Sequence, residues 1–447
     1  MGPYHPPKVD PLDTGKSGHA KFLNEGVPSF NPKEKIQNAA RKLRPSLPTS
    51  QLHPIIIVPG YSGMSLDVKR QNEPQPSKLW LNPWFLSPMR SNAYVQQFYD
   101  ELSMKVEERE EGLFYCPAAA NVEVTPTEYM GSGSGGGTYG CDYILRRMAG
   151  IGVVPYMSPV IASLEGLGYE RNKNIKSANY DWRVSPDHLE NFTTFSEDLR
   201  ELIERTSIDN GGRPVIMLAH SMGNLILCRF LNSMSPDWRE KYIRHFISVA
   251  APWAGVPKTI RDILSGDCIS DNLYTSHFQT FERKRVHRLA QSFGSLVFMH
   301  PGVEIWGKFP LVRCGDKDYD ASQLEELYRE RCSLTGAATI RKRTAEMLET
   351  LRPPQVPLTC FMGKGVRTER RWIYNEPPTD GQWPDEVKLK ESKFTEERRY
   401  WEDEYKELNG GEKVKVETFE GQTHIGILSS KKFLDHLDDL MDVIHKV

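Results

Sequence analysis

The stretch "PVIMLAHSMGN", residues 214–224, decides the fold. An apolar run ends at Ser221, and the chain continues in "NLILCRFLNSM", whose apolar residues have helical spacing. A strand, a tight turn with serine at its apex and a helix form the pattern of a nucleophile elbow. Small residues flank such a serine because strand and helix nearly touch there; Ala219 replaces the usual first glycine and Gly223 keeps the second. The alternative is that Ser221 is an ordinary helix N-cap.

Strands and helices alternate on both sides of this elbow. Apolar spacing predicts helices over residues 155–169 and 195–206, after Ser221, and in the C-terminal "KKFLDHLDDLMDVIHKV". Short apolar runs predict strands in "HPIIIVPGYSG" (53–63), 174–182, 214–218, 244–252, 356–365 and 414–421. This order predicts an α/β fold, with a mostly parallel sheet covered by helices on both faces.

The remaining segments suggest how the chain is divided. Residues 1–50 are rich in Pro, Lys and Asn and are expected to form an extended arm before one catalytic domain, residues 51–447. Within that domain, residues 61–90 are expected to be irregular, and residues 253–350 to be an insertion rather than sheet strands. The glycine-rich "GSGSGGGTYG" (131–140) is expected to be a flexible loop, because it lacks the setting of a phosphate-binding loop.

Composition excludes several classes of protein. The chain has 447 residues, 38% hydrophobic and 26% charged, with a formal charge of -2, which suits a globular protein without a nucleic-acid partner. Its seven cysteines show no metal-ligand spacing, so no metal or other cofactor is expected, and they are either free thiols or include one or two disulfides. No signal peptide or membrane-spanning run is recognised, which favours peripheral membrane association in a cytoplasmic or endomembrane setting.

A nucleophilic serine needs a base and an oxyanion hole. In the chain order serine, acid, histidine, His424 of "VKVETFEGQTHIGIL" is the predicted base, because it follows a strand and precedes the last helix. His436 and His445 lie on that helix and are expected at the surface. The predicted oxyanion donors are the amides of Met222, after the nucleophile, and of Tyr61, in the loop after the first strand.

At this point the sequence resembles the lecithin:cholesterol acyltransferase family, which includes phospholipid:diacylglycerol acyltransferases and a lysosomal phospholipase A. The resemblance extends over roughly residues 54–430 and is carried by "PIIIVPGYSGMSLDVK", "KLWLNPW", "NYDWRVSP", "PVIMLAHSMGN", "FISVAAPWAGVPKTIRDILSGD", "SFGSLVFMHPG" and "TCFMGKGVRTERRWIY". It implies an α/β-hydrolase fold with a lid over about 61–90, a cap over about 253–350, and a lid residue at Trp80 near the acyl site.

The acid of the triad departs from the family pattern. The family motif, Gly-Asp-Gly/Asp/Glu-Thr-Val, is replaced by "NEPPTDGQWPDEVKLKES", residues 375–392. Asp385 keeps the rhythm of the residues that follow the motif, whereas Asp380 keeps an Asp-Gly dipeptide. Asp385 is favoured slightly over Asp380; Glu386, or no acid at all, are the other possibilities. The acid would orient the imidazole and stabilise its cation.

The resemblance implies a lipid O-acyltransferase that works at a phospholipid membrane surface with an acceptor lipid, either a sterol or a diacylglycerol. Phospholipase A activity, with water as the acceptor, is the near alternative, and a catalytically impaired lipid-binding protein is a second. A basic cluster at 283–288 precedes the apolar residues 293–299, which suits either a segment that docks on anionic lipid or an ordinary charged face beside the core.

Overall fold

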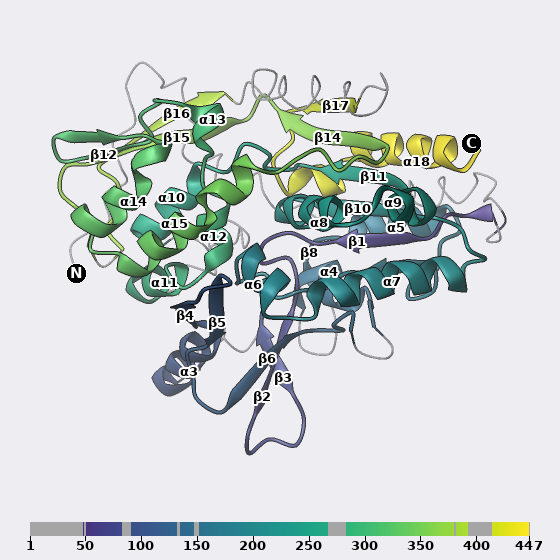
Figure 1. The fold of residues 1–447 in the computed structure, drawn as a ribbon, viewed down its shortest axis with the longest axis horizontal. Helices are drawn as coiled ribbons and strands as arrows, with labels where there is room; N and C mark the ends of the chain where they lie inside the picture. The colour runs from purple at the N-terminus through teal and green to yellow at the C-terminus, as the bar shows by residue number, and fades with distance from the viewer. Residues whose placement is uncertain are drawn as a thin grey trace.

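The computed structural model describes residues 48, 51–82, 91–131, 135–146, 152–266, 283–379, 381–391 and 414–446 (Figure 1). Nearly all of the predicted N-terminal arm lies outside these ranges, and so does Asp380. The described residues form an α/β fold, as predicted.

A six-stranded sheet forms the centre of the molecule, in the order β17-β14-β11-β10-β1-β9. Its strands are β1 (Ile55–Val58), β9 (Ile175–Ser177), β10 (Val215–His220), β11 (Ile243–Val249), β14 (Leu358–Lys364) and β17 (Lys415–Glu420). Every neighbouring pair is parallel. The carboxyl ends of all six strands therefore meet at one edge, which is where α/β folds place their ligands.

Helices cover this sheet. In Figure 1, α7 (Phe195–Asp209), α8 (Met222–Ser233) and α9 (Pro236–Tyr242) lie in front of it. Helices α5 (Ser158–Gly166) and α18 (Lys431–Lys446) pack against each other. Every residue of β1 and β10 is buried, as expected when both faces of a parallel sheet are covered.

Two further sheets contradict parts of the sequence interpretation. The first contains β2 (Leu66–Arg70), β3 (Ser77–Trp80) and β6 (Val122–Pro126), so residues 61–90 are not simply irregular. The second contains β12 (Val312–Cys314), β13 (Lys317–Tyr319), β15 (Arg367–Tyr374) and β16 (Glu386–Glu391), so strands do occur within 253–350. These strands are short, or carry charged residues on a half-exposed face, and so lack the apolar run that marks a buried strand.

Smaller elements surround the sheets. The helices are α3 (Asn92–Leu102), α4 (Tyr139–Asp142), α6 (Pro186–Asn191), α10 (Lys258–Ser265), α11 (Arg283–Ala290), α12 (Gly294–Phe298), α13 (Val303–Trp306), α14 (Leu324–Glu326) and α15 (Thr335–Glu349). Two hairpins are formed by β4 (Met104–Glu108) with β5 (Leu113–Pro117), and by β7 (Tyr143–Arg146) with β8 (Gly152–Pro155).

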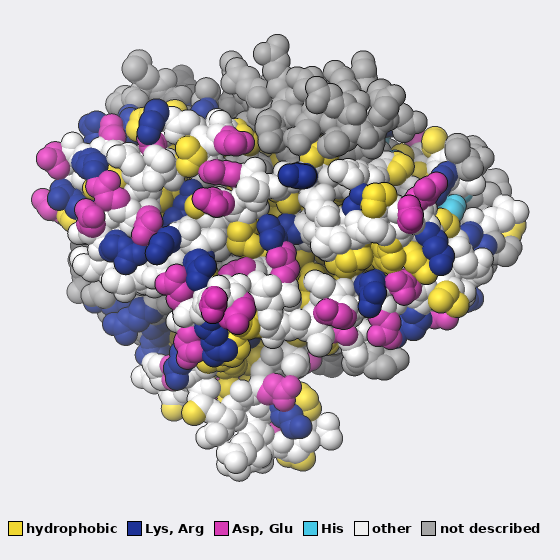
Figure 2. Space-filling model, in the orientation of Figure 1, with side chains coloured by type: hydrophobic (Ala, Val, Ile, Leu, Met, Phe, Trp, Pro, Cys, Tyr) yellow, Lys and Arg dark blue, Asp and Glu magenta, His cyan; other side chains and the backbone are white. Residues whose placement is uncertain are grey.

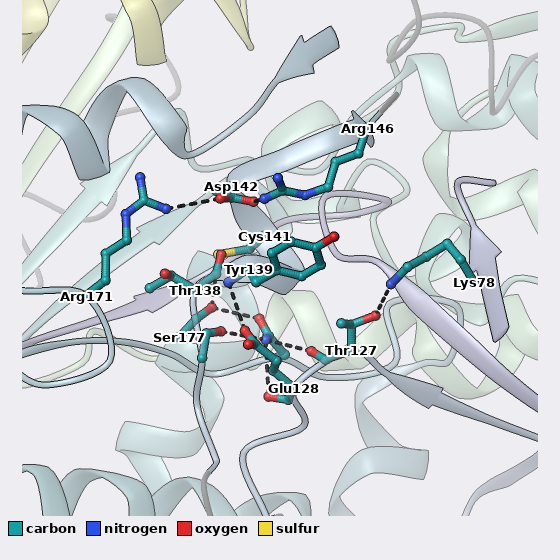
Figure 3. Close-up of polar contacts among 12 residues, drawn as sticks. Lys78, Thr127, Glu128, Thr138, Tyr139, Cys141, Asp142, Arg146, Arg171 and Ser177 are labelled. Atoms are coloured by element: carbon teal, nitrogen blue, oxygen red, sulfur yellow. Dashed lines mark hydrogen bonds and ion pairs between the residues drawn. The ribbon is translucent and has the colours of Figure 1, made fainter. Parts of the chain in front are cut away.

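Part of the glycine-rich stretch 131–140 differs from the flexible loop expected from its composition. The structure describes residue 131 and residues 135–140 of it, and the run 135–138 is buried. The buried Asn179 amide donates to the Gly137 carbonyl over 3.1 Å. A Cβ at Gly137 would lie 2.1 Å from the Glu128 carboxylate, which Figure 3 shows beside this loop. Glycine therefore serves close packing here.

The segment after the basic cluster is part of the core. Phe293, Val297 and Phe298 are fully buried, whereas Lys284 and Arg288 are exposed. The apolar residues are thus unavailable to a lipid surface, and the interfacial hypothesis for this segment is wrong in that respect. Within the described ranges, no helix combines the length and apolar character needed to cross a bilayer. The six cysteines in those ranges are all free thiols.

Candidate active site

Ser221 lies at the sharp turn between β10 and α8. Its backbone has φ 54° and ψ −131°, a strained conformation for a residue other than glycine. Its N–H donates to the Val249 carbonyl over 3.0 Å, which fixes the turn to β11. The Ser221 side chain makes no capping hydrogen bond, so the hydroxyl does not act as an ordinary N-cap. A Cβ at Gly223 would lie 2.3 Å from the Val58 carbonyl oxygen, and this close approach explains why glycine is retained there.

His424 meets Ser221 from the loop after β17. Its Nε2 lies 2.7 Å from the Ser221 hydroxyl oxygen. His424 is an exposed residue by surface area, yet the protein packed around its ring lowers the pKa of the imidazole, to about 4. The imidazole is therefore neutral near pH 7 and can accept a proton through Nε2. Residues 203 positions apart are brought into the geometry of a nucleophile and its base.

The two predicted oxyanion donors lie beside this pair. Met222 begins α8, and the first N–H groups of a helix have no acceptor within the helix. Tyr61 lies in the turn after β1, next to Gly60. A Cβ at Gly60 would be 2.7 Å from the Cβ of Ser221, so the turn and the elbow are in contact. The turn that carries Tyr61 thus packs against the elbow that carries Met222.

Aromatic side chains hold the main chain of this turn. The Tyr180 hydroxyl donates to the Pro59 carbonyl over 2.9 Å. The indole N–H of Trp182 donates to the Met64 carbonyl over 3.1 Å. Both residues belong to the "NYDWR" motif, to which the sequence analysis assigned no role. The motif supports the turn that carries Tyr61.

Trp80, the predicted lid residue, lies at the end of β3. It is 1% exposed, its indole N–H donates to the Ser62 carbonyl over 2.9 Å, and its ring packs edge-on against Trp182. In this structure Trp80 anchors the turn after β1 that carries Tyr61. Its role in a lid stays a prediction, and residues 83–90 of the predicted lid lie outside the described residues.

No sequence motif pointed to Tyr156. Its hydroxyl oxygen accepts from the Gly60 N–H over 2.8 Å and lies 2.8 Å from Nδ1 of His220. The other ring nitrogen of His220 lies 3.0 Å from the His424 carbonyl oxygen. The side chain of His220 therefore bonds Tyr156 and the His424 loop rather than the Ser221 hydroxyl.

Within the described ranges, neither Asp385 nor Glu386 is bonded to His424. Asp385 lies at the start of the β15–β16 hairpin, where its carboxylate accepts from the Asn375 N–H over 2.7 Å. In the part of the chain that the structure describes, no carboxylate is hydrogen-bonded to His424, and burial is the only cause of its shifted pKa. Asp380 lies outside that part. Glu386, the further alternative, pairs with Lys388.

His436 and His445 were expected at the surface, and both are partly exposed, but each has a polar partner. His436 pairs with Glu417, and His445 is bonded to Tyr169. Among the described residues, no group of three His, Cys, Asp or Glu side chains could hold a metal ion.

A surface hollow of about 380 Å³ lies elsewhere, where Figure 2 shows apolar side chains over α7 and α8. Its lining includes Leu189, Phe195, Ile226 and Phe230, but neither Ser221 nor His424. It is separate from the site described above.

Comparisons with known proteins agree with the family resemblance. The family profile of lecithin:cholesterol acyltransferase matches residues 134–313. Lecithin-cholesterol acyltransferase-like 1 of Arabidopsis thaliana is 28% identical over 347 residues, covering 74% of this chain and 78% of the relative. Lysosomal phospholipase A and acyltransferase of Bos taurus is 28% identical over 352 residues, covering 75% and 78%. Phosphatidylcholine-sterol acyltransferase of Gallus gallus is 24% identical over 401 residues, covering 86% and 89%.

These matches agree with the resemblance seen in the sequence, and the relatives are named as acyltransferases, the class of enzyme predicted for this chain. Their names support lipid acyl transfer or phospholipase activity as the general class of function.

Proposed function

We propose that this chain, a relative of the lecithin:cholesterol acyltransferase family, is a serine-dependent lipid O-acyltransferase. It would move a fatty acyl group from a glycerophospholipid to the hydroxyl of a sterol or a diacylglycerol, at a membrane surface to which it binds peripherally. The observation that carries this proposal is the 2.7 Å contact between the Ser221 hydroxyl and the neutral imidazole of His424, at the carboxyl edge of the sheet. That contact is what a serine needs to become a nucleophile.

In the first half-reaction, the Ser221 oxygen attacks the ester carbonyl while its proton passes to Nε2 of His424. The tetrahedral intermediate carries a negative oxygen, for which the Met222 and Tyr61 amides are the donors. When the intermediate collapses, the ester C–O bond breaks, His424 returns its proton to the departing lysolipid oxygen, and the acyl group remains on Ser221.

In the second half-reaction, the acceptor hydroxyl repeats these steps. It loses its proton to His424, attacks the acyl-enzyme and leaves as the new ester, and Ser221 recovers its proton. Water in place of the alcohol gives a free fatty acid, so transferase and phospholipase A differ only in the acceptor. The bovine relative is named as both a phospholipase A and an acyltransferase, which supports testing for both hydrolysis and acyl transfer.

The triad acid is proposed to be one of the two aspartates of residues 375–392. Asp385 would have to leave the Asn375 N–H to serve His424. If neither aspartate acts as the triad acid, the protein would bind lipid with little turnover. This is the second alternative function, a catalytically impaired lipid-binding protein.

The test is incubation of the purified protein with liposomes of phosphatidylcholine labelled in its acyl chain, with and without cholesterol or diacylglycerol. Label in cholesteryl ester or triacylglycerol supports the transferase. Free labelled fatty acid alone identifies a phospholipase A, and liposome binding without turnover identifies a lipid-binding protein.

Ser221→Ala is the control variant, since it removes only the attacking oxygen. Turnover by Ser221→Ala at the wild-type rate would overturn the assignment of the nucleophile. Loss of turnover with an unchanged thermal unfolding midpoint supports it.

A further inference from the structure

We propose that Tyr156 and His220 are positioning residues, which tie the turn after β1 (residues 59–63) to the loop that carries His424. This inference deepens the proposed function and rests on it. Neither side chain reaches the hydroxyl of Ser221. Tyr156 instead bonds the main chain of Gly60, and His220 bonds the main chain of His424.

The direction of each hydrogen bond can be worked out from the partners. The His424 carbonyl can only accept, so Nε2 of His220 carries the proton and donates over 3.0 Å. Burial lowers the pKa of His220 to about 3, so the ring is neutral and its Nδ1 carries no proton. The Tyr156 hydroxyl therefore donates to Nδ1 over 2.8 Å, and its oxygen accepts from the Gly60 N–H over 2.8 Å.

The result is one continuous chain of hydrogen bonds from the Gly60 N–H through Tyr156 and His220 to the His424 carbonyl. Both side chains are nearly inaccessible, with Tyr156 2% and His220 1% exposed. A Cβ at Gly63 would lie 2.4 Å from the Tyr156 ring, so the ring is held against the same turn. Water has little access to this network and could not easily replace a deleted side-chain group. Loss of one hydrogen bond would therefore leave a buried polar group without its partner.

The position of this network explains what it does. The turn at Gly60 and the loop at His424 are far apart in the sequence, since one follows β1 and the other follows β17. In the proposed mechanism, the turn supplies an oxyanion donor and the loop supplies the base, and both must be held around Ser221. A misplacement of about 1 Å can cost about 10²-fold in rate. No carboxylate among the described residues is bonded to the His424 ring. The hydrogen bond from His220 to the His424 carbonyl therefore helps to fix the position of that loop.

Three variants separate the two ends of the network. Tyr156→Phe removes the hydroxyl but keeps the ring. His220→Asn offers an oxygen near the position of Nδ1 and loses the donor to His424, whereas His220→Gln offers a donor near the position of Nε2 and loses the acceptor for Tyr156.

Tyr169→Phe is the matched control. Tyr169 is also buried, and its hydroxyl also bonds a carbonyl, that of His53, and an imidazole, that of His445. It lies at the other end of the sheet, next to the residues that lead into β1. It therefore reports what losing such a hydroxyl does to stability alone.

The readout is the rate at which a fluorophosphonate labels Ser221, together with kcat and KM on the phospholipid. We expect labelling and kcat to fall about 10- to 100-fold in Tyr156→Phe and in both His220 variants, with KM within about twofold of the wild type. Tyr169→Phe should label at the wild-type rate, with a thermal midpoint lowered about as much as in Tyr156→Phe.

Labelling within twofold of the wild type in Tyr156→Phe overturns the proposal, and so does an equal loss of labelling in Tyr169→Phe. If Tyr156→Phe does not fold, the same criteria apply to His220→Gln and His220→Asn. Fluorophosphonate labelling does not depend on the natural substrate. A wild-type protein that labels but does not turn over phospholipid would therefore contradict the proposed function while leaving this inference testable.

Discussion

The two ends of the central sheet carry similar networks of tyrosine, histidine and backbone. At the amino end, the Tyr169 hydroxyl donates to the His53 carbonyl and lies 2.8 Å from Nε2 of His445 on α18. At the carboxyl end, Tyr156 and His220 join two loops that flank Ser221. The first network attaches a helix to the start of a strand. The second restrains groups that the proposed chemistry needs, so the same residue types have different consequences according to the edge of the sheet on which they lie.

The largest effect is expected where the elbow packs against the end of β1. A Cβ at Gly223 would lie 2.3 Å from the Val58 oxygen and 2.5 Å from the Pro59 oxygen, and backbone atoms cannot easily give way. Gly223→Ala should therefore cost about 3 kcal/mol of unfolding free energy and abolish labelling of Ser221. Urea unfolding and fluorophosphonate labelling check this.

Gly336→Ala, in helix α15, is the control for that variant, because a Cβ there meets nothing within 4 Å. It should leave labelling intact and raise stability by about 0.5 to 1 kcal/mol, as expected for Ala in place of Gly in a helix. Wild-type stability in Gly223→Ala would contradict the close packing of the elbow.

The next effect concerns the acid that would orient His424. Since the Asp385 carboxylate is engaged by the Asn375 N–H, Asp385→Asn should change kcat by less than about threefold. Asp380→Asn should lower kcat by about 10²- to 10⁴-fold if that residue orients the imidazole. Steady-state kinetics on the labelled phospholipid measure both; the reverse order of effects would assign the acid to Asp385.

These cases show what the sequence could and could not predict. The elbow and His424 were predictable because strand, turn and helix are encoded locally, and the order of the triad along the chain limits the choice of histidine. The link from Tyr156 to Gly60 and His220 was not, because it arises only when distant segments pack together. Asp385 was favoured on the rhythm of its neighbours, which in the structure belongs to an antiparallel hairpin of the second sheet.

The strands of that second sheet were missed for a related reason. β15, "RTERRWIY", buries only two of its residues, and its charged side chains conceal the alternation that marks a half-buried strand. The central strands, by contrast, are buried on both faces and appear in the sequence as continuous apolar runs.

A smaller effect concerns pH, and here the two ends should behave alike. Burial lowers the pKa of His220 to about 3 and is the largest cause that lowers the pKa of His445 to about 4. In the unfolded chain both would titrate near 6.5, so below that pH the unfolded state binds protons that the folded state does not. Stability should fall by about 1 kcal/mol per imidazole between pH 7.5 and 5.5.

Urea unfolding at the two pH values measures this fall. His445→Gln should show a fall about 1 kcal/mol smaller than that of the wild type, because one of the histidines whose pKa burial lowers is gone. A wild-type stability that rises on acidification over this range would contradict the buried, neutral state of these histidines.

The smallest effect separates the two networks most cleanly. At the amino end, Tyr169→Phe and His445→Gln should each cost about 1 kcal/mol of unfolding free energy, the usual worth of a buried hydrogen bond. Because the two side chains bond each other, the double variant should cost less than the sum of the single variants, with a coupling of about 0.5 kcal/mol or more. None of the three should change the labelling rate of Ser221 by more than about twofold, since they lie at the edge of the sheet opposite the elbow. A labelling rate that falls in step with their stability would mean that the carboxyl end responds to the global stability of the fold, and the distinction between the two networks would fail.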